Sequence, residues 1–89
     1  MQIILTNATE AGMPETMIGH CEQLLAWRIE KLFSSLPEAG AELDILYSEK
    51  DPLMESEEVD DEAYTIYFTV AEVEGSNRED GVVKVDLVF

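Results

Sequence analysis

The side chains able to do chemistry in this sequence are one histidine, one cysteine and a large excess of carboxylates. His20 and Cys21 are adjacent, and neighbours on a helix point about 100° apart, so they do not face each other as a nucleophile and its base must. A single histidine cannot form the histidine cluster of a metal site. Carboxylates are so abundant that proposing any one acid–base pair carries no information. We therefore expect no enzymatic activity, no catalytic residue, no metal and no cofactor.

Cys21 has a second interpretation as a structural residue. It belongs to the apolar stripe of the predicted helix described below, and free cysteine is among the most buried residue types. We expect a buried thiol there. A single cysteine also excludes an internal disulfide, which favours a reducing compartment and hence a cytoplasmic protein, in the host cell if it is phage-encoded. Neither a basic-then-apolar signal segment nor an apolar run of about 20 residues is present in the sequence.

The carboxylates concentrate in residues 49–62, called the acidic segment below. It holds eight acidic residues and one basic residue, and so contributes −7 of the formal net charge of −15. A calcium-binding loop needs alternating carboxylates around a central glycine, and this segment has no glycine and the wrong spacing. Two interpretations stay open, a solvated loop at about 50–62 or a docking surface for Lys and Arg. The acidic residues are Glu49, Asp51, Glu55, Glu57, Glu58, Asp60, Asp61 and Glu62.

The overall charge limits the kinds of partner. Twenty acidic residues stand against five basic ones, and a pI near 4.1 opposes direct binding to DNA, RNA or an anionic membrane. The acidity either serves solubility or attracts a basic protein. Duplex DNA shows one charge per ~1.7 Å of its axis, so closely spaced carboxylates can occupy the same basic groove. We expect the partner to be a basic nucleic-acid-binding protein or complex, with no nucleic acid or membrane bound directly.

Hydrophobic periodicity predicts a helix over residues 14–35. Pro14 suits the first turn of a helix and Glu15 suits its positive end. Pro37 disfavours helical geometry in the residue before it and ends the helix near Ser34 or Ser35. The buried stripe is formed by apolar residues three or four apart, which are Ile18, Cys21, Leu25, Ile29, Leu32 and Leu36.

Alternating apolar residues predict four strands, at residues 2–6, 42–49, 63–73 and 83–89. The last two are expected to form an antiparallel hairpin around the turn residues 75–81. The predicted fold is a single α+β domain covering residues 1–89, in the order β-α-β-β-β. One amphipathic helix packs on one face of a small, largely antiparallel sheet.

Two surfaces of this fold are candidate partner contacts. At about 100° per residue, Trp27 projects away from the sheet with His20, Leu24 and Lys31 beside it. Tryptophan is a favoured hot-spot residue in interfaces. The alternative is that Trp27 is covered within this chain, because the helix is rolled or the loop after Tyr47 folds over it. The uncovered sheet face carries partly apolar residues, either scattered or forming a dimer or adaptor interface. These are Ile4, Leu46, Tyr67, Val82 and Val88.

The pattern of elements resembles the ribosome hibernation-promoting factor family. The resemblance is carried by residues 1–6, the helix over 15–36 with its Glu30-Lys31-Leu32 stretch, the strands over 43–50 and 64–70, and the final strand. It implies a ribosome binder. That family has a second, C-terminal helix and contacts ribosomal RNA through basic residues, whereas this chain ends in a predicted strand and is acidic.

In size, acidity and lack of a catalytic set, the chain also resembles small phage and mobile-element inhibitors, including DNA-mimic and anti-CRISPR proteins. This resemblance implies an acidic inhibitor of a nuclease, CRISPR effector, repair enzyme or restriction enzyme. The acidic segment would block its basic DNA or RNA site, and Trp27, His20 and Lys31 would form a separate contact. The alternatives are an oligomerising adaptor, for instance a homodimer, and a hibernation-factor-like ribosome binder.

Overall fold

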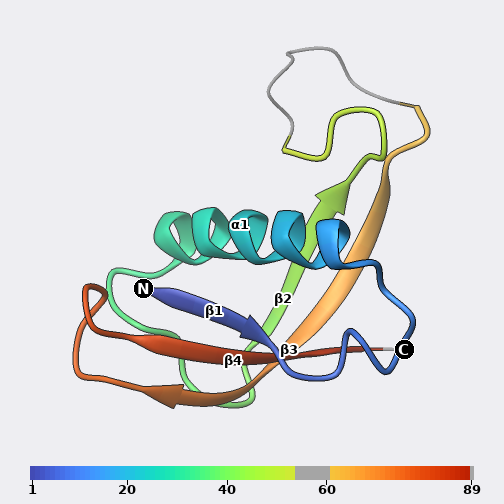
Figure 1. Ribbon diagram of the computed structural model, residues 1–89. Coiled ribbons are helices and arrows are strands. Elements are labelled where there is room, and N and C mark those ends of the chain that lie inside the picture. The colour runs from blue at the N-terminus through green and yellow to red at the C-terminus, as the bar shows by residue number, and fades with distance from the viewer. Residues whose placement is uncertain (54–60, 89) are drawn as a thin grey trace.

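The computed structural model describes residues 1–53 and 61–88, and over these residues the chain forms one helix and four strands (Figure 1). In chain order they are β1 (Gln2–Leu5), α1 (Glu15–Leu32), β2 (Glu42–Tyr47), β3 (Tyr64–Glu74) and β4 (Val82–Leu87). The helix lies across one face of the sheet (Figure 1). The predicted α+β class and the β-α-β-β-β order are confirmed. Phe89, expected in the last strand, lies outside the described residues.

The strands form a mixed sheet in the order β1-β4-β3-β2. β3 pairs antiparallel with both β2 and β4, so the predicted hairpin of the last two strands is confirmed. β1 pairs parallel with β4, with Ile3 opposite Val83 and Leu5 opposite Val85. This order leaves β1 and β2 at the two edges of the sheet.

The core forms where the apolar stripe of α1 meets the inward-facing residues of the strands. Leu25 of the helix and Phe68 of β3 are among its largest fully buried side chains. Fully burying an aliphatic or aromatic side chain stabilises a fold by about 1.5–3 kcal/mol, so these contacts hold the helix to the sheet. The buried core residues are Ile3, Cys21, Leu25, Ile29, Leu43, Ile45, Tyr47, Ile66, Phe68, Val70, Val83 and Val85.

The helix is shorter at its C-terminal end than the predicted range of 14–35. Phe33 has extended geometry (φ −122°, ψ 138°) and caps the helix with a hydrogen bond from its N–H to the Ile29 carbonyl. Leu32, expected in the buried stripe, is 54% exposed, and that expectation is wrong. The reason is that Phe33 and Leu36, outside the helix, pack against the core in its place.

A β-bulge interrupts β3. Val70 lies opposite Val85 but Glu72 lies opposite Lys84, so Ala71 is an extra residue with no partner of its own. The bulge shifts the alternation of side chains by one residue. Val73 then lies opposite buried Val83 and packs against the core, while Glu72 and Glu74 lie on the face that the helix does not cover.

Candidate functional site

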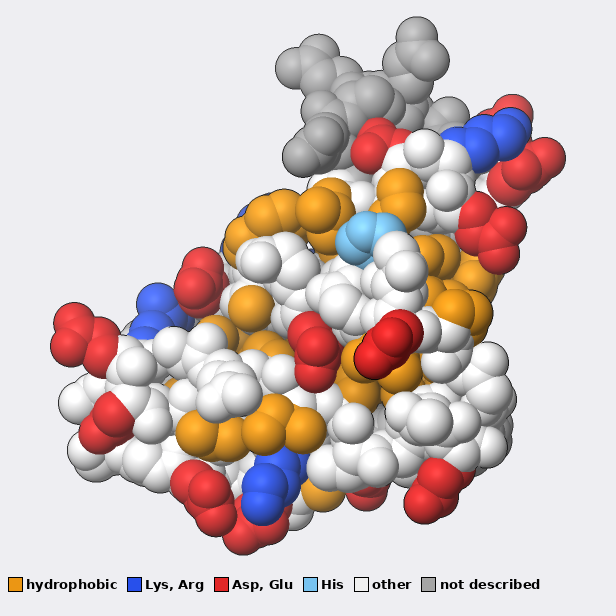
Figure 2. Space-filling view, viewed as in Figure 1, with side chains coloured by type: hydrophobic (Ala, Val, Ile, Leu, Met, Phe, Trp, Pro, Cys, Tyr) orange, Lys and Arg blue, Asp and Glu red, His pale blue; other side chains and the backbone are white. Residues whose placement is uncertain are grey.

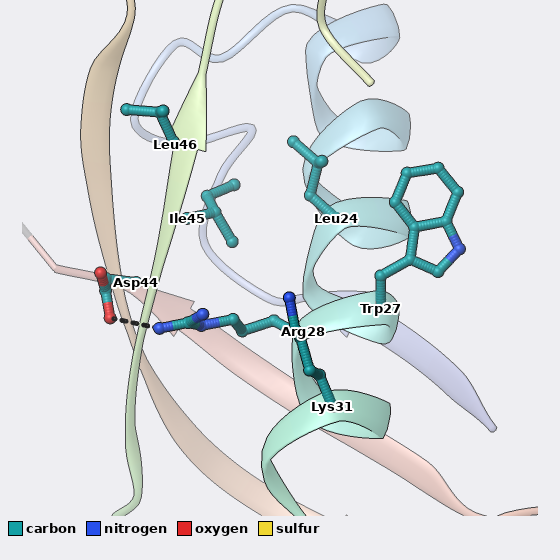
Figure 3. A pocket seen from close by; sticks show the side chains of 7 residues that line it. All are labelled: Leu24, Trp27, Arg28, Lys31, Asp44, Ile45 and Leu46. Carbon is teal, nitrogen blue, oxygen red and sulfur yellow. Dashed lines mark ion pairs between the residues drawn. The ribbon is translucent and has the colours of Figure 1, made fainter. Parts of the chain in front are cut away.

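A groove lies between α1 and the edge strand β2 (Figure 3). Its volume is about 390 Å³, and it is lined by Leu24, Trp27, Arg28, Lys31, Asp44, Ile45 and Leu46. Trp27 stands on the outer side of the helix and is 46% exposed, whereas Leu24 extends toward the strand (Figure 3). The groove therefore combines an apolar floor with an exposed indole, which is the composition of an interface core.

Two predicted contact residues meet in this groove and the third does not. Trp27 and Lys31 both line it. His20 lies instead against Tyr47, with 6.5 Å between the ring centroids, and its Nδ1 is buried without a hydrogen-bond partner among the described residues. His20 is seven residues before Trp27, on the same side of α1, but it lies at the end of β2 and does not line the groove.

Arg28 joins the two walls of the groove. Its Nη2 lies 3.9 Å from Oδ1 of Asp44, and both side chains are substantially exposed. Exposed pairs of this kind contribute about 0–1 kcal/mol, so the contact is easily rearranged. The Nε of Arg28 is buried and has no hydrogen-bond partner within the described part of the chain.

Cys21 is fully buried in the core. Burial, with a smaller contribution from the charge of Glu22, raises the pKa of its thiol from 9.0 to about 11. The thiol is therefore protonated at neutral pH, and a protonated, inaccessible thiol is a poor nucleophile. The prediction of a buried structural cysteine is confirmed.

The acidic segment begins and ends beside a tyrosine pair. Tyr47 and Tyr64 lie opposite each other at the ends of β2 and β3, with their rings 5.8 Å apart in an edge-on arrangement. Burial raises the pKa of both phenols, and the carboxylate of Glu49 adds to the effect.

An ion pair links the two sides of the acidic segment. Lys50 Nζ lies 3.4 Å from a carboxylate oxygen of Glu62. Ser48, just before the acidic segment, is buried, and its Oγ accepts hydrogen bonds from the backbone N–H groups of Lys50 and Asp51. These hydrogen bonds form a turn at the start of the segment. Glu49, Asp51, Asp61 and Glu62 are therefore within the described structure. The other predicted acidic residues, Glu55, Glu57, Glu58 and Asp60, lie outside the described residues.

The uncovered sheet face carries a second group of carboxylates, of which the sequence suggested Glu72 and Glu74 as an extension of the acidic segment. Alternation along β2 and β4 and the bulge in β3 place five acidic residues on it, with Lys84 bridging two of them at 3.4 Å and 4.0 Å. The signal for the bulge is the spacing of Val70 and Val73, which are three residues apart in a strand. The five residues are Glu42, Asp44, Glu72, Glu74 and Asp86.

All five basic residues of the sequence lie in the described part of the chain, and four of them have acidic or carbonyl partners there. Arg28, Lys50 and Lys84 form ion pairs, and Arg78 donates a 3.0 Å hydrogen bond to the Glu30 carbonyl near the end of α1. Acidic side chains are spread over the face shown in Figure 2, with few basic ones among them. The negative charge is therefore spread across this face.

Neither a metal-binding cluster nor a membrane-spanning helix is found in the described residues. They contain no group of three or more His, Cys, Asp or Glu side chains arranged to hold a metal ion. No helix in residues 1–53 and 61–88 is long and apolar enough to cross a membrane.

A scan against protein-family models found no match for this chain, and neither a search of curated proteins nor a search of solved structures found one. Function is therefore inferred from the charges, surfaces and geometry of the chain itself.

Proposed function

We propose that this protein is an acidic inhibitor that acts in the cytoplasm by binding a basic nucleic-acid-handling protein and blocking its DNA or RNA site. The observation that carries the proposal is the pairing of the basic residues. Three of the five are ion-paired with carboxylates, and 20 acidic residues against five basic ones leave a formal net charge of −15. The electrostatic field of this negative charge attracts a positively charged groove over long range, and salt weakens the attraction.

Charge spacing explains why several elements must contribute to the mimicry. Carboxylates on alternate residues of one strand, such as Glu42 and Asp44, are about 7 Å apart, and neighbouring strands are about 5 Å apart. Duplex DNA carries one charge per ~1.7 Å of axis. The charges on a single strand are too far apart to match the charge density of duplex DNA. The acidic sheet face and the acidic segment would therefore act together.

The first experiment identifies the partner and tests competition. Tagged full-length protein is used to recover binding proteins from host lysate at low salt, and each recovered nucleic-acid-binding protein is purified. The proposal predicts that this chain displaces labelled DNA or RNA from one of them, and that displacement weakens as salt is raised toward roughly 0.5 M. Binding that leaves the nucleic acid in place would contradict the proposal.

Matched charge variants locate the mimic surface. We expect Glu57→Gln, Glu58→Gln, Asp60→Asn and Asp61→Asn together to weaken displacement at least about tenfold, because they remove clustered charges. The control removes the same number of charges at dispersed exposed positions, by Glu10→Gln, Glu30→Gln, Glu38→Gln and Glu79→Gln. Equal loss in both variants would show that net charge alone matters, against a role for the acidic segment.

A second candidate function is an oligomerising adaptor that uses the uncovered sheet face. Three apolar residues are exposed at one corner of that face, with Tyr67 59% exposed beside Leu46 and Val88. Two of them line a shallow pocket with Glu42 and Thr69. Sedimentation velocity tests this candidate, because a monomer at every concentration from micromolar to near-millimolar would exclude it.

A further inference from the structure

The outer edge of β2 is an open strand edge. The N–H of Val70 donates to the carbonyl of Ala41 at 2.8 Å, which makes Ala41 a hydrogen-bonded partner of β3. Hydrogen-bonded and non-hydrogen-bonded residues alternate along an antiparallel strand pair. The backbone N–H and C=O groups of Leu43 and Ile45 therefore also point toward β3. The backbone N–H and C=O groups of Glu42, Asp44 and Leu46 therefore point outward, away from the sheet.

The other edge of the sheet is better protected. β1 has only four residues, and the N–H of Leu5 donates a 3.3 Å hydrogen bond to a carboxylate oxygen of Glu22 on α1. Short strands and covering side chains are ways in which proteins blunt an edge. β2 is longer, with six residues, and is the edge that a further strand can reach.

The two sides of the β2 edge differ in chemistry. On the helix side, the groove offers Leu24, Trp27 and Ile45. On the open sheet face, Glu42 and Asp44 present carboxylates. An extended chain alternates its side chains between the two faces of a sheet. The segment that fits this edge therefore places apolar residues toward the groove and Lys or Arg residues toward Glu42 and Asp44.

The Arg28–Asp44 ion pair crosses this edge. Arg28 comes from the helix layer, whereas the alternation of β2 places Asp44 on the opposite sheet face. The Arg28 side chain must pass around the outer edge of β2 to come within 3.9 Å of Asp44 (Figure 3). An incoming strand would displace it, and the weakness of an exposed ion pair makes that displacement easy.

We propose that the outer edge of β2 takes up an extended segment of the basic partner as a fifth strand, with the Arg28–Asp44 pair opening to admit it. This inference rests on the proposed function, because it names the contact by which that partner is held. Backbone hydrogen bonds supply affinity in strand addition, and the alternating side-chain contacts supply specificity. Opposite charges directly across a strand pair add to the stabilisation.

Charge disfavours a second copy of this chain as the occupant. Pairing two β2 edges antiparallel about Asp44 would place two Asp44 carboxylates opposite each other, between molecules that each carry a net charge of −15. Like charges directly opposite are destabilising. A basic segment meets no such repulsion.

Three capped peptides of one sequence test the proposal without the natural partner. The parent peptide is Lys-Val-Lys-Val-Lys-Val-Lys, and its binding is followed by amide chemical shifts of Glu42–Tyr47 and the indole N–H of Trp27. In an antiparallel pairing the lysine N–H groups face β2, because hydrogen-bonded residues share a side-chain face. We expect N-methylation of the lysines to weaken binding at least about tenfold, and N-methylation of the valines to leave it within about twofold.

The two methylated peptides have the same sequence and charge and differ by a single methyl group, so their comparison separates strand addition from simple attraction. Equal binding by both, or shifts that avoid β2, would overturn the inference while leaving the proposed competition with nucleic acid intact. Loss on valine methylation instead would support strand addition in the parallel orientation. Conversely, selective peptide binding without any nucleic-acid competition would overturn the proposed function and leave only a strand-binding edge.

A pair of protein variants tests the opening of the ion pair. Arg28→Ala removes the side chain that crosses the edge, and we expect it to bind the parent peptide up to about fivefold more tightly. Lys31→Ala removes the same charge from the same groove without touching the edge. An equal gain in both variants would mean that only charge has changed, and would contradict displacement of Arg28.

Discussion

At the scale of single residues, burial decides the chemistry of Cys21. The side chain has no exposed surface, and a charged thiolate in that position would lose its hydration. This is why the pKa of the thiol is raised to about 11. Cys21 is therefore part of the packing between α1 and the sheet, as its place in the apolar stripe predicted.

The raised pKa predicts how stability depends on pH. Below pH 9 the thiol is protonated in both the folded and unfolded states, so its contribution to the free energy of unfolding is fully present. As pH rises from 9 toward 11, the unfolded thiol ionises and the folded one does not, which lowers the free energy of unfolding by roughly 2–3 kcal/mol. Tyr47 and Tyr64 act in the same direction, since burial raises the pKa of each.

Urea unfolding under reducing conditions, at a series of pH values from 8 to 11, measures this loss. The control is Cys21→Ala, which removes the thiol and keeps the part of the tyrosine contribution that burial causes. We expect the variant to be less stable at pH 8 but to lose less stability between pH 9 and 11. Parallel profiles for the two proteins would show that the thiol does not titrate differently in the folded state.

At the scale of elements, the turn between β3 and β4 requires a glycine at position 75. Gly75 has a φ of 98°, and an added Cβ would lie 2.8 Å from the Asp80 carbonyl oxygen. The Asp80 carboxylate accepts hydrogen bonds from the backbone N–H groups of Ser76 and Asn77, which fixes the turn. Asp80 is thus a structural residue of this turn.

Two glycine substitutions should therefore have opposite effects. Gly75→Ala is expected to destabilise the protein by about 1–3 kcal/mol, because alanine is strained at positive φ and the added methyl group meets backbone. Gly19→Ala, in α1 with open space around it, is expected to stabilise by about 0.5–1 kcal/mol through helix propensity. Urea unfolding of both variants tests the pair, and a shift of the same sign in both would contradict the assignment.

Periodicity predicted the elements well because each pattern reports a local geometry. The spacing of Cys21, Leu25 and Ile29 identified the buried side of α1, and alternation identified three of the strand faces. The burial of Leu32 was predicted wrongly, since periodicity does not say where a helix runs off the edge of its sheet. The bulge at Ala71 was missed because it breaks the alternation on which the prediction depends.

The candidate site was predictable only in part. Helical geometry placed Trp27 and Lys31 on one side, and they do line one groove. The opposite wall of that groove comes from β2, and no local pattern reveals that β2 is an edge strand. Strand order depends on which faces and ends pair in three dimensions, so the Arg28–Asp44 contact was outside the reach of the sequence. The role of these residues in partner binding stays a prediction.

At the scale of the whole molecule, the net charge of −15 opposes the compact state. The Debye length falls from about 30 Å at 0.01 M salt to about 3 Å at 1 M, so added salt screens this repulsion. Salt also weakens the exposed ion pairs, but each contributes only about 0–1 kcal/mol. The repulsion among twenty carboxylates is the larger effect, and salt should stabilise the fold.

We therefore expect the melting temperature to rise with sodium chloride between low salt and roughly 0.5 M, by about 4–8 °C for each kcal/mol of repulsion screened. Thermal unfolding followed by circular dichroism measures the rise. The variant carrying amides at Glu57, Glu58, Asp60 and Asp61 has a net charge of −11, four units less negative than −15, and should show a smaller rise. A melting temperature that falls with salt would mean that ion pairs outweigh repulsion.

The parallel pairing of β1 with β4 also sets an order of events during biosynthesis. In the strand order β1-β4-β3-β2, the neighbour of β1 is β4. Ile3 can therefore pair with Val83 only after β4 has been synthesised. Pairings between segments so distant in the chain form late and slow the folding of small domains. While translation proceeds, the β2–β3 hairpin can already associate with α1. The first strand can therefore join the sheet only after residues 82–87 have left the ribosome.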